Sequence, residues 1–323
     1  MNRRPAIATS ILMACLCVAY QAATSSTPVS RSPDRTLTPI QAVAITSQNK
    51  IFAGTFGLGM FSSSDGGRTW SAANADLSNQ NVLAVTARNK GAIFVGTFGG
   101  GVYRSDNNDG SRWVQVNAGL NSKEVTCLQT GEDGNVYAGT STGQIFHSSD
   151  NGESWMYIGD LGEFITTLAI AGNENILAGT SRGIYRTHNA GRTWARGNPG
   201  MTCHDVWSLA VDQHGNVFAG TNGGGVYLSL DAGETWAQIN AGLKCKNVGS
   251  VAVCVTGKVF VGTTDGVFVS ADEGKSWSSF VSNGPDSVVR CLTVGLNGQL
   301  LVGSHWIDIF SSNPVQPLPE DGV

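Results

Sequence analysis

The chain has 323 residues, of which 42 are glycine and only 14% are charged. This composition is typical of an all-β domain with many tight turns, and it argues against a helical or an intrinsically disordered protein. The net charge is −4, and the sequence has no basic run, so we expect no nucleic-acid partner.

The first residues resemble an export signal. Arg3 and Arg4 precede the apolar stretch Ala6–Val18, which is too short to span a bilayer. We therefore interpret residues 1–21 as a signal peptide and expect a periplasmic, extracellular or envelope-anchored protein. No later segment is apolar for long enough to predict a transmembrane helix.

The way in which the signal ends stays open between two alternatives. Leu12-Met13-Ala14-Cys15 resembles a bacterial lipobox, in which Cys15 would carry lipid, although Met13 departs from the usual small or branched residue. Plain cleavage near Ala19 or Ala22 is the other alternative.

Residues 22–38 are rich in Ser, Thr and Pro, which is the composition of a flexible tether. The spacing of the repeats described below would place a ring-closing strand near Pro28–Pro33, although its Pro and Ser content is poor for a strand. The segment is therefore predicted to be a tether, with ring closure as a second hypothesis.

The rest of the chain consists of a repeat of about 41 residues. The string Phe-Ala-Gly-Thr or a close variant recurs at intervals of 40 to 43 residues. Its glycines are Gly54, Gly96, Gly139, Gly179, Gly220, Gly262 and Gly303.

Each copy has the same order of short apolar runs and turns. In the fifth copy the runs are Val206–Val211, Val217–Thr221 and Gly225–Ser229, and a fourth begins at Trp236. Runs of this length, separated by turn formers, indicate strands. We predict a single all-β, seven-bladed β-propeller of four-stranded antiparallel blades over residues 39–313, followed by a tail at 314–323.

Between the third and fourth runs lies the most specific motif of the chain. It reads Ser-Ser-Asp-Asn-Gly-Glu-Ser-Trp at Ser148–Trp155 and resembles the Asp-box, or bacterial neuraminidase repeat. The resemblance covers nearly all of residues 40–312. The motif residues, which we interpret as structural, are Asp65, Trp70, Asp150, Trp155, Asn189, Trp194, Asp231, Trp236, Asp272 and Trp277.

The box has a local physical reason. An Asp or Asn side chain can accept hydrogen bonds from backbone N–H groups a few residues on, and the glycine can adopt a positive φ. The tryptophan then begins the outer strand and can pack against the blade. A calcium or sugar site is the other interpretation, but in the resembling families the box is a structural turn away from the active site. We expect no metal site.

The catalytic motifs that can be found are explained by the repeat. Gly139–Gly143 and Gly179–Gly183 match G-x-S-x-G, but both fall at the ordinary hairpin after the second strand, whereas a nucleophile elbow needs a following helix. A phosphate-binding loop, a zinc-protease motif and a dinucleotide fingerprint are absent. We therefore expect no cofactor and assign no catalytic residue.

Several families with Asp-box propellers offer different functions. Sialidases resemble this chain in the box, but it lacks their Arg-Ile-Pro motif and an arginine triad, so a typical exo-sialidase is not expected. Xyloglucanase-like glycosidases use two such domains, whereas this chain has one. Photosystem II assembly factors use a similar propeller as a scaffold, and sortilin-like receptors use a larger one to capture peptides. Fold alone does not choose among them.

Residues that interrupt the repeat point to a binding face opposite the boxes. Aromatic side chains among polar ones suit a glycan or a protein ligand. The candidates are Phe56, Phe98, Glu124, Arg182, Asp205, Trp207, Asp265, Arg290, His305 and Trp306. The other interpretation is that the aromatic rings plug the channel or pack between blades.

We therefore predict an exported, monomeric, non-catalytic binding or scaffolding propeller. The enzymatic alternative is a glycoside hydrolase, in which Glu124 and Asp205 would lie about 5 Å or about 6.5–9.5 Å apart.

Five cysteines follow the predicted signal, an odd number that argues against a disulfide framework. Cys127 and Cys291 occupy the same small position of the repeat and are predicted to be core residues. Cys203 and Cys245 lie in equivalent loops and are the one pair considered for a bridge.

Overall fold

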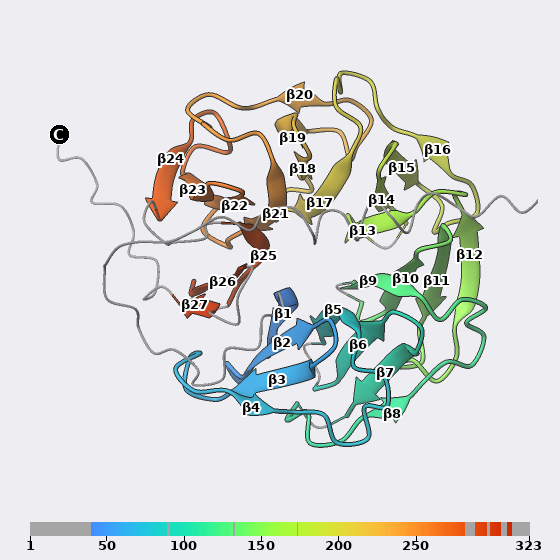
Figure 1. Ribbon diagram of the computed structural model, residues 1–323. Coiled ribbons are helices and arrows are strands. Elements are labelled where there is room, and N and C mark those ends of the chain that lie inside the picture. The colour runs from blue at the N-terminus through green and yellow to red at the C-terminus, as the bar shows by residue number, and fades with distance from the viewer. Residues whose placement is uncertain are drawn as a thin grey trace, which may run out of the picture.

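The computed structural model describes residues 40–88, 91–106, 108–131, 133–172, 174–281, 288–295, 298–304 and 309–311. These residues form strands, turns and loops, and the sheets they build are arranged around a central axis (Figure 1). Among them no helix is long and apolar enough to cross a membrane. The predicted signal peptide, tether, ring-closing strand and C-terminal tail lie outside the described residues.

The strands follow the repeat, and within each sheet they are antiparallel neighbours in chain order. The first three sheets are β1 (Ile40–Ile45), β2 (Ile51–Thr55), β3 (Gly59–Ser63), β4 (Ser71–Ala72); β5 (Val82–Ala87), β6 (Ile93–Thr97), β7 (Gly101–Ser105), β8 (Val114–Gln115); and β9 (Val125–Thr130), β10 (Val136–Thr140), β11 (Gln144–Ser148), β12 (Met156–Asp160). The next three are β13 (Ile165–Ile170), β14 (Ile176–Thr180), β15 (Gly183–Thr187), β16 (Ala195–Arg196); β17 (Val206–Val211), β18 (Val217–Thr221), β19 (Gly225–Ser229), β20 (Ala237–Gln238); and β21 (Val248–Val253), β22 (Val259–Thr263), β23 (Gly266–Ser270), β24 (Ser278–Val281). The last sheet is β25 (Val289–Val294), β26 (Leu300–Ser304), β27 (Ile309–Ser311).

The prediction of a seven-bladed propeller with four strands in every blade is wrong. The described residues form six complete four-stranded blades, so that by complete blades the propeller is six-bladed, and the seventh repeat forms only the three-stranded sheet β25–β27. The physical reason is visible in the sequence, because the seventh repeat runs into Ser311-Ser312-Asn313-Pro314 without a box tryptophan to begin an outer strand.

The first strand of each sheet lies nearest the axis, and β1 contacts both β5 and β25, so the inner strands close a ring (Figure 1). Side chains link neighbouring inner strands. The Thr126 hydroxyl donates to the Ile165 carbonyl at 2.6 Å, and the Ser250 hydroxyl accepts from the Leu292 amide at 2.9 Å.

The repeated glycine permits close packing between blades. The second strands are buried along their whole length. A Cβ atom on Gly54 would lie 2.4 Å from a methyl group of Val82, and one on Gly262 would lie 2.3 Å from a methyl group of Val289. Any larger residue would push the next inner strand away, which explains why the glycine recurs with the blade period.

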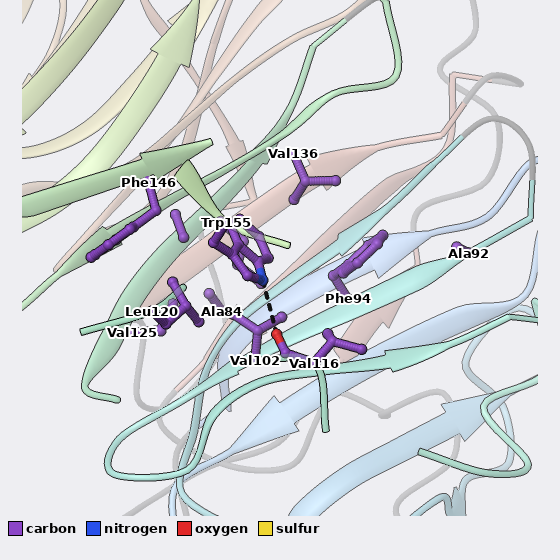
Figure 2. Close-up of a cluster of buried hydrophobic side chains, with 12 residues drawn as sticks. Ala84, Ala92, Phe94, Val102, Val116, Leu120, Val125, Val136, Phe146 and Trp155 are labelled. Carbon is purple, nitrogen blue, oxygen red and sulfur yellow. Dashed lines mark hydrogen bonds between the residues drawn. The ribbon is translucent and has the colours of Figure 1, made fainter. Parts of the chain in front are cut away.

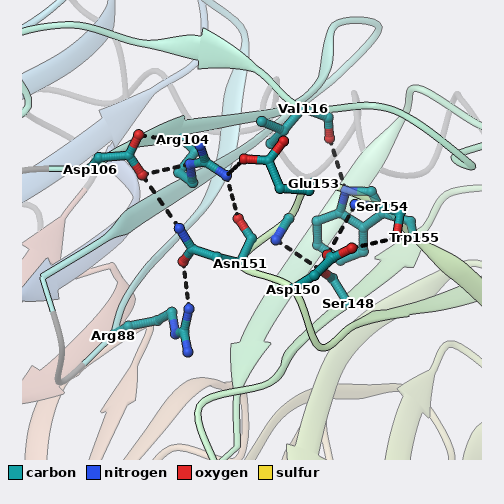
Figure 3. Close-up of polar contacts among 11 residues, drawn as sticks. Arg88, Arg104, Asp106, Val116, Ser148, Asp150, Asn151, Glu153, Ser154 and Trp155 are labelled. Atoms are coloured by element: carbon teal, nitrogen blue, oxygen red, sulfur yellow. Dashed lines mark hydrogen bonds and ion pairs between the residues drawn. The ribbon is translucent and has the colours of Figure 1, made fainter.

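Each box is a closed hydrogen-bonded turn, as Asp150 shows (Figure 3). Its carboxylate accepts from the Ser154 amide at 3.0 Å, the Ser154 hydroxyl at 2.5 Å and the Ser148 hydroxyl at 2.8 Å. These bonds, the one from the Ser154 hydroxyl foremost, lower the pKa of Asp150 to about 2. Asn189 makes the corresponding bonds with a neutral amide.

The box tryptophan packs beyond its own blade. Trp155 is 4% exposed and its indole N–H donates to the Val116 carbonyl of the preceding blade at 2.8 Å (Figure 2). Arg104 adds a polar link between the same two blades, with ion pairs of 2.7 Å to Asp106 and to Glu153 (Figure 3). The box face is therefore largely occupied with holding blades together.

Candidate binding face

The face opposite the boxes consists of the hairpins between second and third strands and the loops that enter the next inner strand. Backbone bonds join the two. The amides of Gly57 and Gly59 both donate to the Gln80 carbonyl at 3.0 Å, and those of Gly99 and Gly101 both donate to the Lys123 carbonyl at 2.9 Å. Each of these hairpins is therefore fixed against the following blade, which makes the face a rigid one.

An asparagine after the outer strand holds the same hairpins from behind. The Asn117 side chain accepts from the Val102 amide at 2.8 Å and donates to the Gly100 carbonyl at 2.9 Å. Gly101 has φ of +77°, and a Cβ atom there would lie 2.2 Å from the Asn117 oxygen. Sequence reasoning missed this element, although its signal was present, because an asparagine stands four residues after the box tryptophan in four repeats. They are Asn74, Asn117, Asn198 and Asn240.

Phe56 and Phe98 lie side by side on this face. Their ring centroids are 6.4 Å apart with an interplanar angle of 52°. The rings remain open to solvent, with exposed fractions of 40% and 37%. Each phenylalanine forms a β-bridge with the residue that precedes the next inner strand, Phe56 with Asn81 and Phe98 with Glu124. The pair is thus displayed by backbone that cannot easily rearrange.

Polar groups border the pair. The Asn79 amide donates to the Phe98 carbonyl at 3.2 Å, and its oxygen accepts from the Asn81 amide at 3.0 Å. Gln80 and Lys123 are exposed in the same two loops. The pair is therefore an apolar centre beside amide groups and one cation.

Glu124 extends this arc to the third blade. Its carboxylate accepts a hydrogen bond from the Ser141 hydroxyl, and its carbonyl accepts from the Ser141 amide at 3.0 Å. Ser141 belongs to the hairpin that matched the nucleophile-elbow pattern, and here it binds a neighbouring loop. We refer to Phe56, Phe98, Glu124 and the adjoining Asn79 and Lys123 as the aromatic arc.

Three other predicted residues have local partners instead. Arg182 pairs with Glu163 at 3.1 Å, and the Glu163 side chain is 12% exposed. Asp205 accepts from the Asn222 amide at 2.9 Å. Asp265 is exposed at the hairpin of the sixth blade. The structure therefore places them on the same face but does not join them to the arc through any contact among the described residues.

Trp207 and Arg290 are the second residues of β17 and β25 and are half-buried near the axis. The corresponding Thr126 and Thr166 donate to the next inner strand, so this position looks across the channel between blades. His305 and Trp306 lie outside the described residues.

The cysteines form no bridge among the described residues, so the Cys203–Cys245 pairing that we considered is not present. The Cys203 sulfur lies 3.1 Å from the Asn222 carbonyl, and the Cys245 sulfur lies 3.1 Å from the Thr264 hydroxyl. Each thiol thus contacts the hairpin of its own blade. Burial raises the pKa of Cys127 to about 12.

The hollows of the molecule lie elsewhere. A cavity of about 200 Å³ in the channel is lined by inner-strand residues that include Gln129, Leu168, Leu209 and Asp212. Another of about 340 Å³ lies beside the first box at Lys50. Within the described ranges no cluster of three His, Cys, Asp or Glu residues could hold a metal ion. The aromatic arc is therefore a surface for contact and not a deep pocket.

The family model described as photosynthesis system II assembly factor YCF48 matches residues 42–293. No curated protein matches the chain.

Solved structures share the fold. The extracellular domain of BT4673 from B. thetaiotaomicron is similar over 85% of this chain with a TM-score of 0.68 and 16% identity, and the chain spans 38% of its length. YCF48 bound to D1 peptide has a TM-score of 0.70 and 15% identity, covering 83% of this chain and 91% of that one. The GH74 xyloglucanase from Xanthomonas campestris has a TM-score of 0.71 and 16% identity, covering 88% of this chain and 53% of that one.

Proposed function

Because the chain belongs to the family described as photosynthesis system II assembly factor YCF48, we propose that it is a non-catalytic binding propeller that holds an extended segment of a protein partner on the aromatic arc. The observation that carries the proposal is the exposed Phe56–Phe98 pair on backbone fixed between blades. In this proposal the export signal predicted at residues 1–21 places the propeller outside the cytoplasm.

The geometry of the pair suits an extended peptide. A strand rises about 3.3 Å per residue, so side chains on one face recur roughly every 6.6 Å. The centroid separation of 6.4 Å is close to that repeat, so two alternate apolar side chains of a ligand could each contact one ring. The amide groups of Asn79 and Gln80 can bind the ligand backbone, because extended peptides present unpaired N–H and C=O groups.

A glycan fits this arrangement less well. Rings inclined at 52° do not form a flat platform for a sugar. The solved structure titled YCF48 bound to D1 peptide also supports a peptide ligand, since it shares this fold.

Glycoside hydrolysis is the second candidate, because GH74 enzymes share the fold. Its mechanism needs two carboxyl groups about 5 Å or about 6.5–9.5 Å apart, one of them protonated. Glu124 and Asp205 instead accept hydrogen bonds from Ser141 and Asn222, and such bonds favour the charged form.

The test compares peptide binding by the native chain with that of Phe56→Ala, Phe98→Ala and Leu230→Ala. Leu230 is the matched control, because it is 73% exposed but lies in a box on the opposite face. A library of extended, apolar-patterned peptides serves as the probe, beside a glycan array and a polysaccharide hydrolysis screen.

We expect each phenylalanine variant to weaken peptide binding about tenfold, which corresponds to about 1.4 kcal/mol, while Leu230→Ala binds normally. Binding confined to glycans would contradict the peptide proposal. Turnover that disappears in Glu124→Gln would establish the hydrolase instead.

A further inference from the structure

The indole group of each later box tryptophan is bonded to the preceding blade. Trp113 donates to the Ala73 carbonyl at 2.7 Å, and Trp155 donates to the Val116 carbonyl at 2.8 Å. In every case the acceptor stands three residues after the preceding box tryptophan. The other pairs are Trp194 with Ile158, Trp236 with Gly197 and Trp277 with Ile239.

Trp70 departs from this rule. The blade before it is the sheet β25–β27, which has no outer strand among the described residues. Its indole instead donates to the Gly67 carbonyl of its own box at 3.0 Å, and the ring is only half-buried against Ile40, Ile51 and Leu301. Within the described part of the chain, the edge of β27 and the indole of Trp70 thus border an open strand position.

We propose that residues 28–33 occupy this position in the same chain, with Val29 and Ser30 as the fourth strand of the last sheet. The proposal is independent of the function assigned to the aromatic arc. Spacing supports it, because a box tryptophan stands 12 residues before the next inner strand in five of six blades, and 12 residues before Ile40 is Pro28. The pairs are Trp70 and Val82, Trp113 and Val125, Trp194 and Val206, Trp236 and Val248, and Trp277 and Val289.

Proline at the two ends of the segment does not prevent this pairing. The outer strands β4, β8, β16 and β20 are only two residues long and exposed, so two residues between the prolines are enough. Proline is tolerated beside an edge strand. Pro33 also has a counterpart in Pro199, which stands at the same distance from its inner strand and whose carbonyl accepts from the Trp236 amide at 2.9 Å.

The pairing register follows from the first blade. Gly54 pairs with Met60 in β3, and Ser62 of β3 pairs with Ser71, the residue after Trp70. Gly303 pairs with Ile309 in β27. Ser311 therefore corresponds to Ser62, and its predicted partner is Val29. By the tryptophan rule, the carbonyl of Arg31 is the acceptor for Trp70.

A cross-linking experiment tests both the segment and its register. The variant Val29→Cys with Ser311→Cys is oxidised mildly, and its bridges are mapped by mass spectrometry. Facing residues of antiparallel strands have Cα atoms about 4.5–5.5 Å apart, within disulfide range. The control, Ser25→Cys with Ser311→Cys, moves the thiol four residues or roughly 13 Å along an extended chain. The two single variants measure reaction with the native cysteines.

We expect the 29–311 bridge within one chain, forming at least tenfold faster than the 25–311 bridge. Equal rates, or no bridge in a chain whose circular dichroism is native, would overturn the proposal. A bridge found only between two chains would show that a second copy fills the position, and would also overturn it.

A second measurement does not depend on cysteine chemistry. Deleting residues 24–33 should lower the melting temperature and shift tryptophan emission to the red, and the red shift should vanish when Trp70→Phe is combined with the deletion. A synthetic peptide of residues 24–36 should reverse both changes. An unchanged melting temperature after the deletion would refute the proposal.

Discussion

Trp155 offers the most direct test of how the blades are held together. Its ring is buried among Phe94, Phe146 and Val136, and its N–H bonds to the Val116 carbonyl of the preceding blade (Figure 2). Replacement by alanine removes both the packing and the bond, whereas replacement by phenylalanine keeps most of the packing and removes the bond.

The magnitude follows from the burial. A buried tryptophan removes about 150–250 Å² from water, which at about 25 cal/mol per Å² is worth roughly 4–6 kcal/mol. Measured Trp→Ala losses in protein cores are about 3–5 kcal/mol, so we expect Trp155→Ala to lose about that much. Trp155→Phe leaves the Val116 carbonyl without its partner and should lose about 1–3 kcal/mol.

Urea unfolding followed by circular dichroism measures these losses from the midpoint and slope. Met156→Ala is the control, because Met156 is the next residue and is 60% exposed, so its change should stay within about 0.5 kcal/mol. If Trp155→Ala lost no more than Met156→Ala, the inference that the box tryptophan joins neighbouring blades would be refuted.

Two further predictions concern the box carboxylates and the thiols. The folded-state pKa of Asp150 is lowered from 3.8 to about 2, so its stabilisation is present above about pH 4 and is lost as the pH falls through about 2. The stability difference between native chain and Asp150→Asn, which imitates Asn189, should therefore shrink between pH 4 and pH 2 in acid-unfolding curves; parallel curves would contradict this. Burial raises the pKa of Cys127 and Cys291 to about 12, so at pH 8 iodoacetamide should label Cys203 and Cys245 and leave those two unlabelled until the chain unfolds. Equal labelling rates by mass spectrometry would disprove it.

The repeat unit was predictable because its determinants are local. The box uses an acceptor, a glycine and a tryptophan within eight residues, and the strand lengths follow from the apolar runs and turns. The count of complete blades was not predicted correctly. Seven glycines such as Gly303 announced seven repeats, but a fourth strand also needs residues after the third, and the last repeat does not supply them in the described chain.

The asparagine support of the hairpins was missed for a different reason. Asn117 contacts Val102 and Gly100, which lie 15 and 17 residues away. Its recurrence could be read from the sequence, but its role could not, because the partner groups are backbone atoms that carry no sequence signal.

By itself, then, the sequence determined the β class, the strand order and the box turns, all of which depend on residues close together in the chain. The tertiary structure alone decided which residues meet between blades. It placed Phe56 beside Phe98 at 42 residues' separation, joined Ser141 to Glu124, and directed Cys203 and Cys245 to their own hairpins. Those outcomes depend on the angle and distance between neighbouring sheets, which side-chain packing sets across the whole ring and which no periodic pattern of a single repeat contains.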